Sequence, residues 1–255
     1  TFWEFLQNGA TESSGPTGRV DTRQEFDSPF DLGSWRFVPF VTGRGSVWSD
    51  SPDEGGLERA YGAVGVRGTT YLSRVYPDVR SELLDIDGVR HIIKPEIVAW
   101  GAASNVGPQD LYQFDQTVEG IQDVSGVLLG VRQRWQTKRG EGVNRRNVDV
   151  FTYDLDVAVF DDANGDYTTN GYASYSRPEE SLTRNYVNSS TNWRVNDRTA
   201  ILTEMNYDLN NADVDILNVS MAVERTPRLS YLIGYRFIDQ TESNLLGFDL
   251  NYKLT

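Results

Sequence analysis

His91 is the only histidine of the chain, and an imidazole is well suited to act as a general base near neutral pH. A membrane-embedded hydrolase would pair such a histidine with a serine and an orienting amide. Serines are abundant, but no G-x-S-x-G turn singles one out as a nucleophile. A lone histidine at the start of a strand is more often structural, so we predict no catalytic residue.

A second group of possible ligands lies between residues 161 and 166. Asp162, Asn164 and Asp166 could offer three oxygens to a calcium ion. The stretch lacks the full EF-hand spacing and its distal glutamate, and Asn164-Gly165 is a strong hairpin-turn signal. We therefore interpret it as a turn and predict no metal site and no cofactor.

Composition excludes several classes of protein. The net charge of -13 argues against a nucleic-acid partner, because phosphates require a basic surface. The absence of cysteine excludes disulfide scaffolds and cysteine-ligated zinc. No apolar run approaches the roughly 18 residues of a membrane-spanning helix, and the mean hydropathy is -0.48.

The elements that must position any functional residue are predicted to be strands. Many of them have ten or more residues, against about five to six in ordinary globular proteins. Membrane strands require about 9–11 residues. We expect about a dozen strands and no helix beyond one or two turns, with strands at 19–30, 34–48, 58–76, 89–101, 122–138, 147–160, 167–176, 183–194, 199–209, 214–225, 229–238 and 244–254.

Four segments near the C-terminus have apolar residues at every second position, as in Leu246, Phe248, Leu250 and Tyr252. A period of two places one set of side chains on each face of a strand, and short turns imply antiparallel neighbours. A soluble sandwich would bury the apolar face, whereas a transmembrane barrel exposes it to lipid and keeps the polar face in a wet lumen.

The middle of the chain favours the barrel. Residues 151, 153, 155, 157 and 159 are apolar or aromatic and are expected to point outward. Asp154 and Asp156 would then share the opposite face, which is costly in a dry core but not in a hydrated lumen. The polar residues expected to face the lumen are Arg132, Arg134, Asp154, Asp156 and Arg236.

Short motifs are similar to a known family. Arg19-Val20-Asp21, the segment 35–44, the segment 88–97 and the segment 123–134 resemble the C-terminal barrel region of the LptD family of outer-membrane lipopolysaccharide-assembly proteins, also called the organic-solvent-tolerance family. The resemblance covers roughly residues 17–255. The positions that match its motifs are Pro29, Pro39, Arg44, Arg90, His91 and Pro95.

The resemblance implies an antiparallel up-and-down transmembrane β-barrel in the outer membrane of a Gram-negative cell. It implies transport without covalent chemistry, so the chain is expected not to be an enzyme. Implied partners are lipopolysaccharide, a plug lipoprotein in the barrel lumen, the periplasmic lipopolysaccharide-transport bridge proteins and the outer membrane itself, and a lateral gate between the first and last strands would pass the lipid.

The domain organisation expected is a loop or partial strand at 1–18 followed by one β-barrel segment at 19–255. The family's barrel has about twice the strands counted here, so we expect this segment to be part of a larger barrel. Neither a signal peptide nor a terminal aromatic residue is present, in keeping with a segment of a longer protein.

Two other functions fit the same residues. One is another outer-membrane barrel, such as a porin or a polysaccharide exporter. The other is a secreted soluble β domain that binds glycans through the 13 Tyr and 6 Trp.

Overall fold

Within the residues that it describes, the computed structural model contains thirteen strands, and its only helices there are two 3-10 turns. These turns are η1 (Pro108–Asp110) and η2 (Gly142–Asn144). The structure describes residues 16–53, 55–112, 114–115, 118–121, 123–140, 142–161, 185–239 and 241–254. Within these ranges, no helix is both long and apolar enough to cross a membrane.

The strands are long and follow one another along the chain. Their bounds are β1 (Arg19–Asp27), β2 (Phe30–Leu32), β3 (Trp35–Trp48), β4 (Leu57–Thr69), β5 (Leu72–Ser81), β6 (Ile86–Ser104), β7 (Gly126–Arg139), β8 (Arg146–Phe160), β9 (Tyr186–Asn196), β10 (Thr199–Asp208), β11 (Asp213–Thr226), β12 (Leu229–Ile238) and β13 (Ser243–Tyr252).

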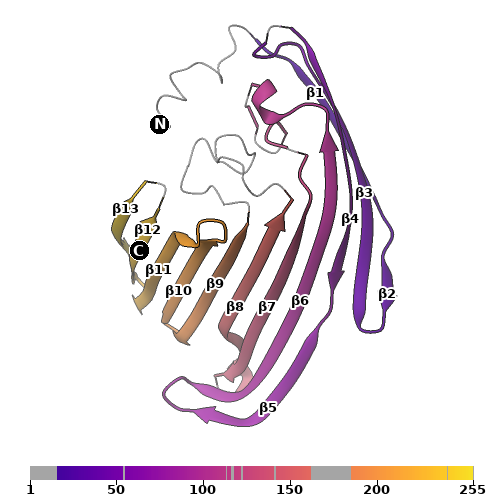
Figure 1. The fold of residues 1–255 in the computed structure, drawn as a ribbon. Coiled ribbons are helices and arrows are strands. Elements are labelled where there is room, and N and C mark those ends of the chain that lie inside the picture. Colours follow the sequence, from indigo (N-terminus) through magenta and orange to yellow (C-terminus); the bar gives the residue numbers. More distant parts are fainter. Residues whose placement is uncertain are drawn as a thin grey trace.

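All strands belong to a single antiparallel up-and-down sheet, as the sequence predicts (Figure 1). The order is β1-β3-β4-β6-β7-β8-β9-β10-β11-β12-β13, with β2 paired to β3 and β5 paired to β6. Within the described residues, β1 pairs only with β3, and β13 pairs only with β12. The sheet is therefore a curved wall with two open edges.

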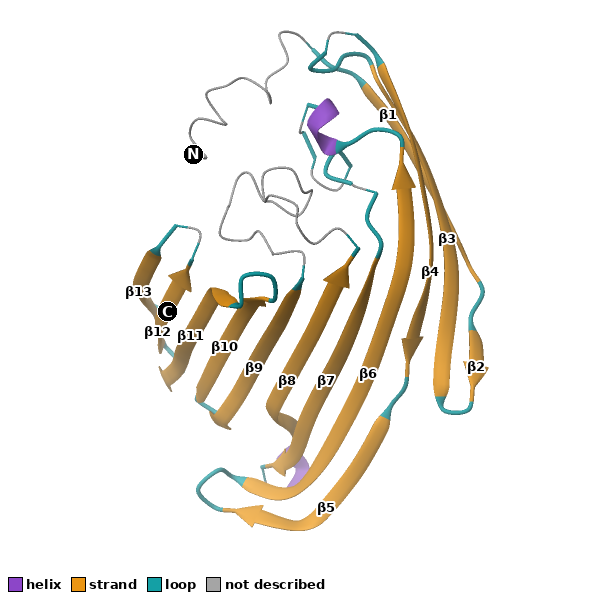
Figure 2. Ribbon diagram, viewed as in Figure 1, coloured by secondary structure: helices purple, strands orange, loops and turns teal. Residues whose placement is uncertain are grey.

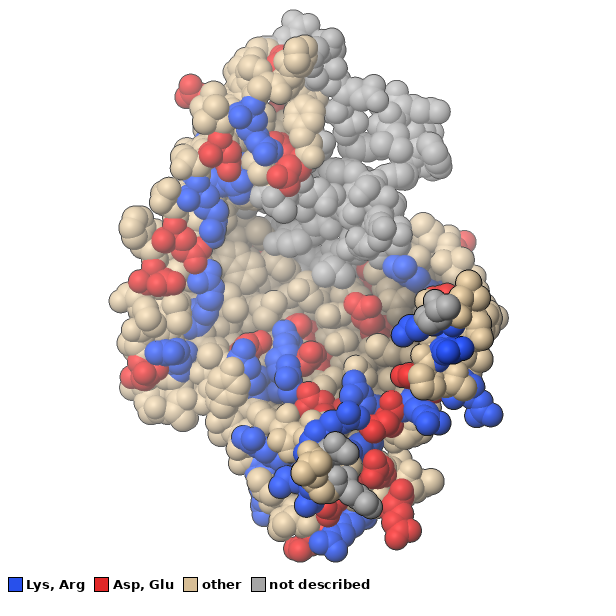
Figure 3. Space-filling view, turned by 180° about the vertical axis from the view of Figure 1, so that it is seen from behind, with Lys and Arg blue, Asp and Glu red and all other residues tan. Residues whose placement is uncertain are grey.

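The alternation of side chains gives the wall two chemically different faces. Val131 pairs with Leu155 on one face, and Arg132 pairs with Asp154 on the other. The apolar positions lie on the convex face, and the charged and amide side chains lie on the concave face. Figure 3 shows this hollowed side, with charged side chains gathered along β1 and β3 and across its lower part.

A register shift on β8 extends the concave face toward the short-turn end. The pairing moves from Phe151 opposite Trp135 to Asp149 opposite Gln136, which leaves Val150 as an extra residue. Between this bulge and the start of β8, the odd-numbered residues of β8 lie on the concave face. Asp149 accepts a hydrogen bond from the Gln136 side-chain amide at 2.8 Å as a result.

Connections differ in length between the two ends of the wall (Figure 2). At one end the strands are joined by short turns, such as 33–34, 197–198 and 227–228. The other end carries the longer connections, including 49–56 and 105–125, and it is also where β8 ends and β9 begins. Such asymmetry is typical of outer-membrane barrels, whose periplasmic turns are short.

The structure corrects some strand boundaries. The strand expected at 58–76 is divided at Thr70, whose amide donates to the Pro95 carbonyl at 3.4 Å while its hydroxyl donates to Ser34 at 2.6 Å. After this point the chain leaves β3 and pairs only with β6 as β5, which continues to Ser81. The short strand β2 was not expected. The strand expected at 167–176 lies outside the described residues, as does most of the loop expected at 1–18.

Candidate functional site

The concave face of the wall gathers the polar groups of the chain into three neighbouring regions. The first lies on β6, β7 and β8, the second crosses β8 to β12, and the third lies on β1, β3 and β4. Each region is formed by alternate residues of adjacent strands, because residues paired across an antiparallel sheet share a face.

Arg132 is the centre of the first region. Its Nη2 lies 2.8 Å from Oδ1 of Asp156, its Nε lies 3.6 Å from Oε2 of Glu96, and its Nη1 donates to the Leu155 carbonyl at 3.2 Å. Lys94 also forms an ion pair with Glu96. Arg132 and Lys94 are thus paired with Asp156 and Glu96.

Two further residues expected in the lumen lie on the same face. Asp154 sits directly opposite Arg132 in the β7–β8 register. Arg134 Nη1 is 3.8 Å from Oδ2 of Asp149, and the arginine side chain is 62% exposed. This second pair is loose and open to solvent, in contrast to that of Arg132.

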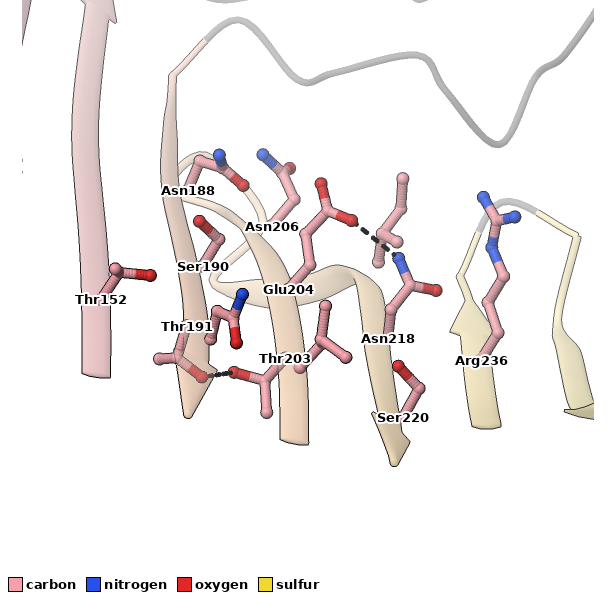
Figure 4. Close-up of a pocket in the computed structure, with 13 residues that line it drawn as sticks. Thr152, Asn188, Ser190, Thr191, Thr203, Glu204, Asn206, Asn218, Ser220 and Arg236 are labelled. Carbon is pink, nitrogen blue, oxygen red and sulfur yellow. Dashed lines mark hydrogen bonds between the residues drawn. The ribbon is translucent and has the colours of Figure 1, made fainter. Parts of the chain in front are cut away.

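Amide and hydroxyl side chains line the second region, a hollow of about 740 Å³ (Figure 4). Asn218 donates to Glu204 at 3.1 Å. Asn206 is 2% exposed, and both polar atoms of its amide lack a hydrogen-bond partner in the described part of the chain. The inward-facing residues of the hollow are Thr152, Asn188, Ser190, Asn192, Leu202, Glu204, Asn206, Ile216, Asn218, Ser220 and Arg236.

Arg236 differs from Arg44 and Arg132, which both pair with carboxylates of the concave face. It extends from β12 into the hollow in Figure 4, and no carboxylate of the described residues lies within ion-pair distance. Its Nε also lacks a hydrogen-bond partner. Arg236 is therefore a cation available to an anionic group that enters the hollow.

The third region was not predicted from the sequence. Arg44 binds Asp21 through two parallel hydrogen bonds, Nε to Oδ1 and Nη2 to Oδ2, both 2.8 Å. Arg67 donates to Glu25 at 3.0 Å, and Arg23 also pairs with Glu25. The available signal was the alternation of charge at positions 19, 21, 23 and 25 of β1.

The positions that match the family motifs do not form one site. Arg44 faces inward, whereas Pro39 lies in β3 opposite Val66. Pro29 lies between β1 and β2, and the Pro95 carbonyl accepts a hydrogen bond from the Thr69 hydroxyl at 3.2 Å. Arg90 lies on β6 opposite Gln136. These positions are spread over both faces of the wall.

His91 lies on the convex face, away from the hollow. Its ring stacks on Trp135 with centroids 4.2 Å apart, and its Nε2 lies 3.0 Å from the Gln133 side-chain oxygen. The ring of Trp135 in turn lies next to that of Phe151, with centroids 5.1 Å apart. His91 thus belongs to an aromatic row of the outer surface.

No three histidine, aspartate or glutamate side chains of the described residues are arranged to hold a metal ion. The calcium-like stretch at Asp162–Asp166 lies outside those residues.

Comparison with known proteins finds similarity in structure but none in sequence. No protein-family profile matches the chain, and no curated protein sequence matches it. A solved structure, the Salmonella typhi outer membrane phospholipase (OMPLA) dimer with bound calcium, aligns with a TM-score of 0.29 and 8% identity over 92% of this chain and 78% of that chain. A TM-score this low supports no inference about the function of this chain.

The expectation that the chain is not an enzyme is corrected by this comparison. The aligned outer-membrane protein is a phospholipase. The exclusion of catalysis rested on the resemblance to a transport family, which no family profile and no curated sequence shows for this chain, and it is withdrawn.

Proposed function

We propose that the chain forms part of the wall of an outer-membrane β-barrel whose concave face lines a hydrated conduit. The observation that carries this proposal is the exposure of apolar side chains along the convex face. Val64 is 60% exposed, Leu129 51%, Phe248 66% and Leu246 82%. A soluble sheet would cover such a surface, whereas lipid stabilises it.

The height of the apolar band fits a membrane. On β8 the apolar band extends from Phe151 to Val159. This is a length of about 26 Å along the strand, at roughly 3.3 Å per residue. A strand tilt of about 40° reduces this to about 20 Å, close to the apolar band of about 25 Å in outer-membrane barrels. His91, Trp135, Phe151 and Trp193 lie in one row at its lower boundary, where aromatic girdles occur.

Membrane association is tested by extraction of the intact gene product from cell envelopes. We expect it to remain in the pellet after washing with alkaline carbonate or urea and to be released only by detergent. Release by either wash would favour the secreted glycan-binding domain instead.

Within this role, we propose that the conduit passes lipopolysaccharide to the outer leaflet. Support comes from the resemblance to the LptD family and from the chemistry of the hollow. Asn188, Asn218 and Ser220 offer neutral donors and acceptors that suit sugar hydroxyls, and Arg236 suits a phosphate or carboxylate. The plug lipoprotein, the periplasmic bridge proteins and the lateral gate belong to this proposal.

Photocrosslinking in living cells separates this substrate from others. A photoreactive residue in place of Asn218 should form a lipopolysaccharide adduct only while new lipopolysaccharide is being delivered. A photoreactive residue in place of Leu246, on the convex face, should form adducts with resident lipid even after ATP depletion. An adduct-free Asn218 position together with rapid solute flux would instead indicate a porin.

A further inference from the structure

Part of the connection between β6 and β7 folds back over the concave face. We call the described residues 105–112, 114–115 and 118–121 the inner strap. In Figure 1 it includes the short turn η1 inside the upper part of the curve. The strap lies at the end of the wall that carries the longer connections.

An apolar cluster packs the strap against the wall. Val106, Leu111 and Val118 contact Trp48 of β3, and Leu57 of β4 packs against the same cluster. Leu111 is 2% exposed and Trp48 1%. This is one of the two buried apolar clusters in the described residues, so the strap is held against the wall by burial of apolar side chains.

A buried carboxylate fixes the position of the strap. Glu119 is 0% exposed, and its Oε1 accepts hydrogen bonds from Arg19 Nη1 at 2.7 Å and from Trp48 Nε1 at 3.1 Å. Its Oε2 accepts the backbone amide of Asp115 at 2.8 Å. A buried carboxylate is tolerated only with such partners, because removal of one leaves an uncompensated charge.

Arg59 of β4 adds a second attachment. Its Nη2 donates to the Val118 carbonyl at 2.8 Å, and its guanidinium lies 5.0 Å from the centre of the Trp48 ring. Arg59 is 2% exposed, and its Nε and Nη1 lack hydrogen-bond partners. The wall therefore buries an incompletely paired cation beneath the strap.

We propose that the inner strap is a built-in constriction at the long-loop mouth of the conduit, latched by Glu119 to Arg19 and Trp48. This proposal rests on the proposed function in one respect: the concave face must enclose a conduit. With the latch closed, the strap covers part of a polar wall that would otherwise admit small solutes. When the ion pair is broken, the strap leaves the wall and the mouth widens.

Thiol accessibility measures strap release directly, because these 255 residues contain no cysteine and any cysteine elsewhere in the gene product can be replaced by serine. Val118→Cys places one thiol in the cluster at a site 5% exposed. In the intact gene product in detergent, we expect Glu119→Ala to raise the maleimide labelling rate at position 118 by about tenfold or more. Asp123→Asn removes an exposed carboxylate close to the strap and should leave the rate unchanged.

Global unfolding is distinguished by a thiol in the other apolar cluster. Ala158→Cys, at a site 0% exposed, should stay protected when Glu119 is replaced. If positions 118 and 158 both become labelled, Arg19→Gln is the deciding variant. It changes the partly exposed arginine of the ion pair and leaves the buried Glu119 in place. Labelling at 118 alone in that variant supports the latch, and protection at both sites overturns it.

Conductance in lipid bilayers tests the constriction itself. Glu119→Ala should raise single-channel conductance above that of the parent and of Asp123→Asn. Unchanged conductance with a released strap would overturn the proposal. The labelling assay needs no lipopolysaccharide, so failure of the proposed substrate would not affect its result.

Discussion

Arg132 Nη2 lies 2.8 Å from Oδ1 of Asp156, although the two residues are not directly opposite each other in the β7–β8 register. The direct partner of Asp156 is Gly130, whose missing side chain leaves room for the arginine to cross diagonally. A Cβ at position 130 would lie 2.9 Å from the same carboxylate oxygen. The polar face thus depends on a small residue next to a large one.

A double-mutant cycle should measure this pair. Arg132→Ala and Asp156→Ala are expected to be coupled by about 1 kcal/mol, since the side chains are only 30% and 15% exposed. Urea unfolding of the intact gene product in lipid vesicles provides the measurement. The exposed pair Arg134–Asp149, at 3.8 Å, is the matched control and should show coupling near zero. Equal coupling in the two pairs would refute the burial argument.

Thiol labelling should alternate along β8. Single cysteines at Asp154 and Asp156 are expected to react with a membrane-impermeant reagent, because the conduit is hydrated. Cysteines at Leu155 and Val157 should be protected by lipid. Labelling at 155 and 157, with protection at 154 and 156, would reverse the assignment of faces.

The strands could be predicted from sequence because a period of two is a local signal. Leu246, Phe248, Leu250 and Tyr252 already show which side of β13 is apolar. The division of β4 from β5 was not predictable in this way, because alternation continues through Thr70 while the hydrogen-bonding neighbour changes.

The site was only partly predictable for the same reason. Alternation places Arg132 and Asp156 on one face, but it does not show which carboxylate an arginine will bind. The contact of Glu119 with Arg19 spans 100 residues, and no periodic pattern marks it. Strict alternation along β8 would place Asp149 on the convex face with Phe151. The bulge at Val150 places it on the concave face instead.

A charge on the convex face should be far more costly than one on the concave face. Leu155→Arg places a guanidinium near the middle of the apolar band and is expected to lower the free energy of unfolding by about 2–4 kcal/mol. Ser190→Arg, which points into the hollow three strands away from Arg236, should change it by less than about 1 kcal/mol. Unfolding in vesicles measures both variants. Similar losses would show that the convex face is not in contact with lipid.

Gly65 should be the least replaceable glycine of β4. A Cβ at this position would lie 2.5 Å from the Ala99 carbonyl oxygen and 2.6 Å from the Phe40 ring, so even alanine requires β3 or β6 to move. We expect Gly65→Ala to lower the free energy of unfolding by about 1–3 kcal/mol, the usual cost of overpacking. Gly62, on the same strand, has no atom within 4 Å of its Cβ position, so Gly62→Ala should stay within about 0.5 kcal/mol of the parent. Urea unfolding in vesicles compares the two variants directly. A neutral Gly65→Ala would mean that the Phe40 ring does not rest over β4, and the packing of β3 against β4 and β6 would need revision.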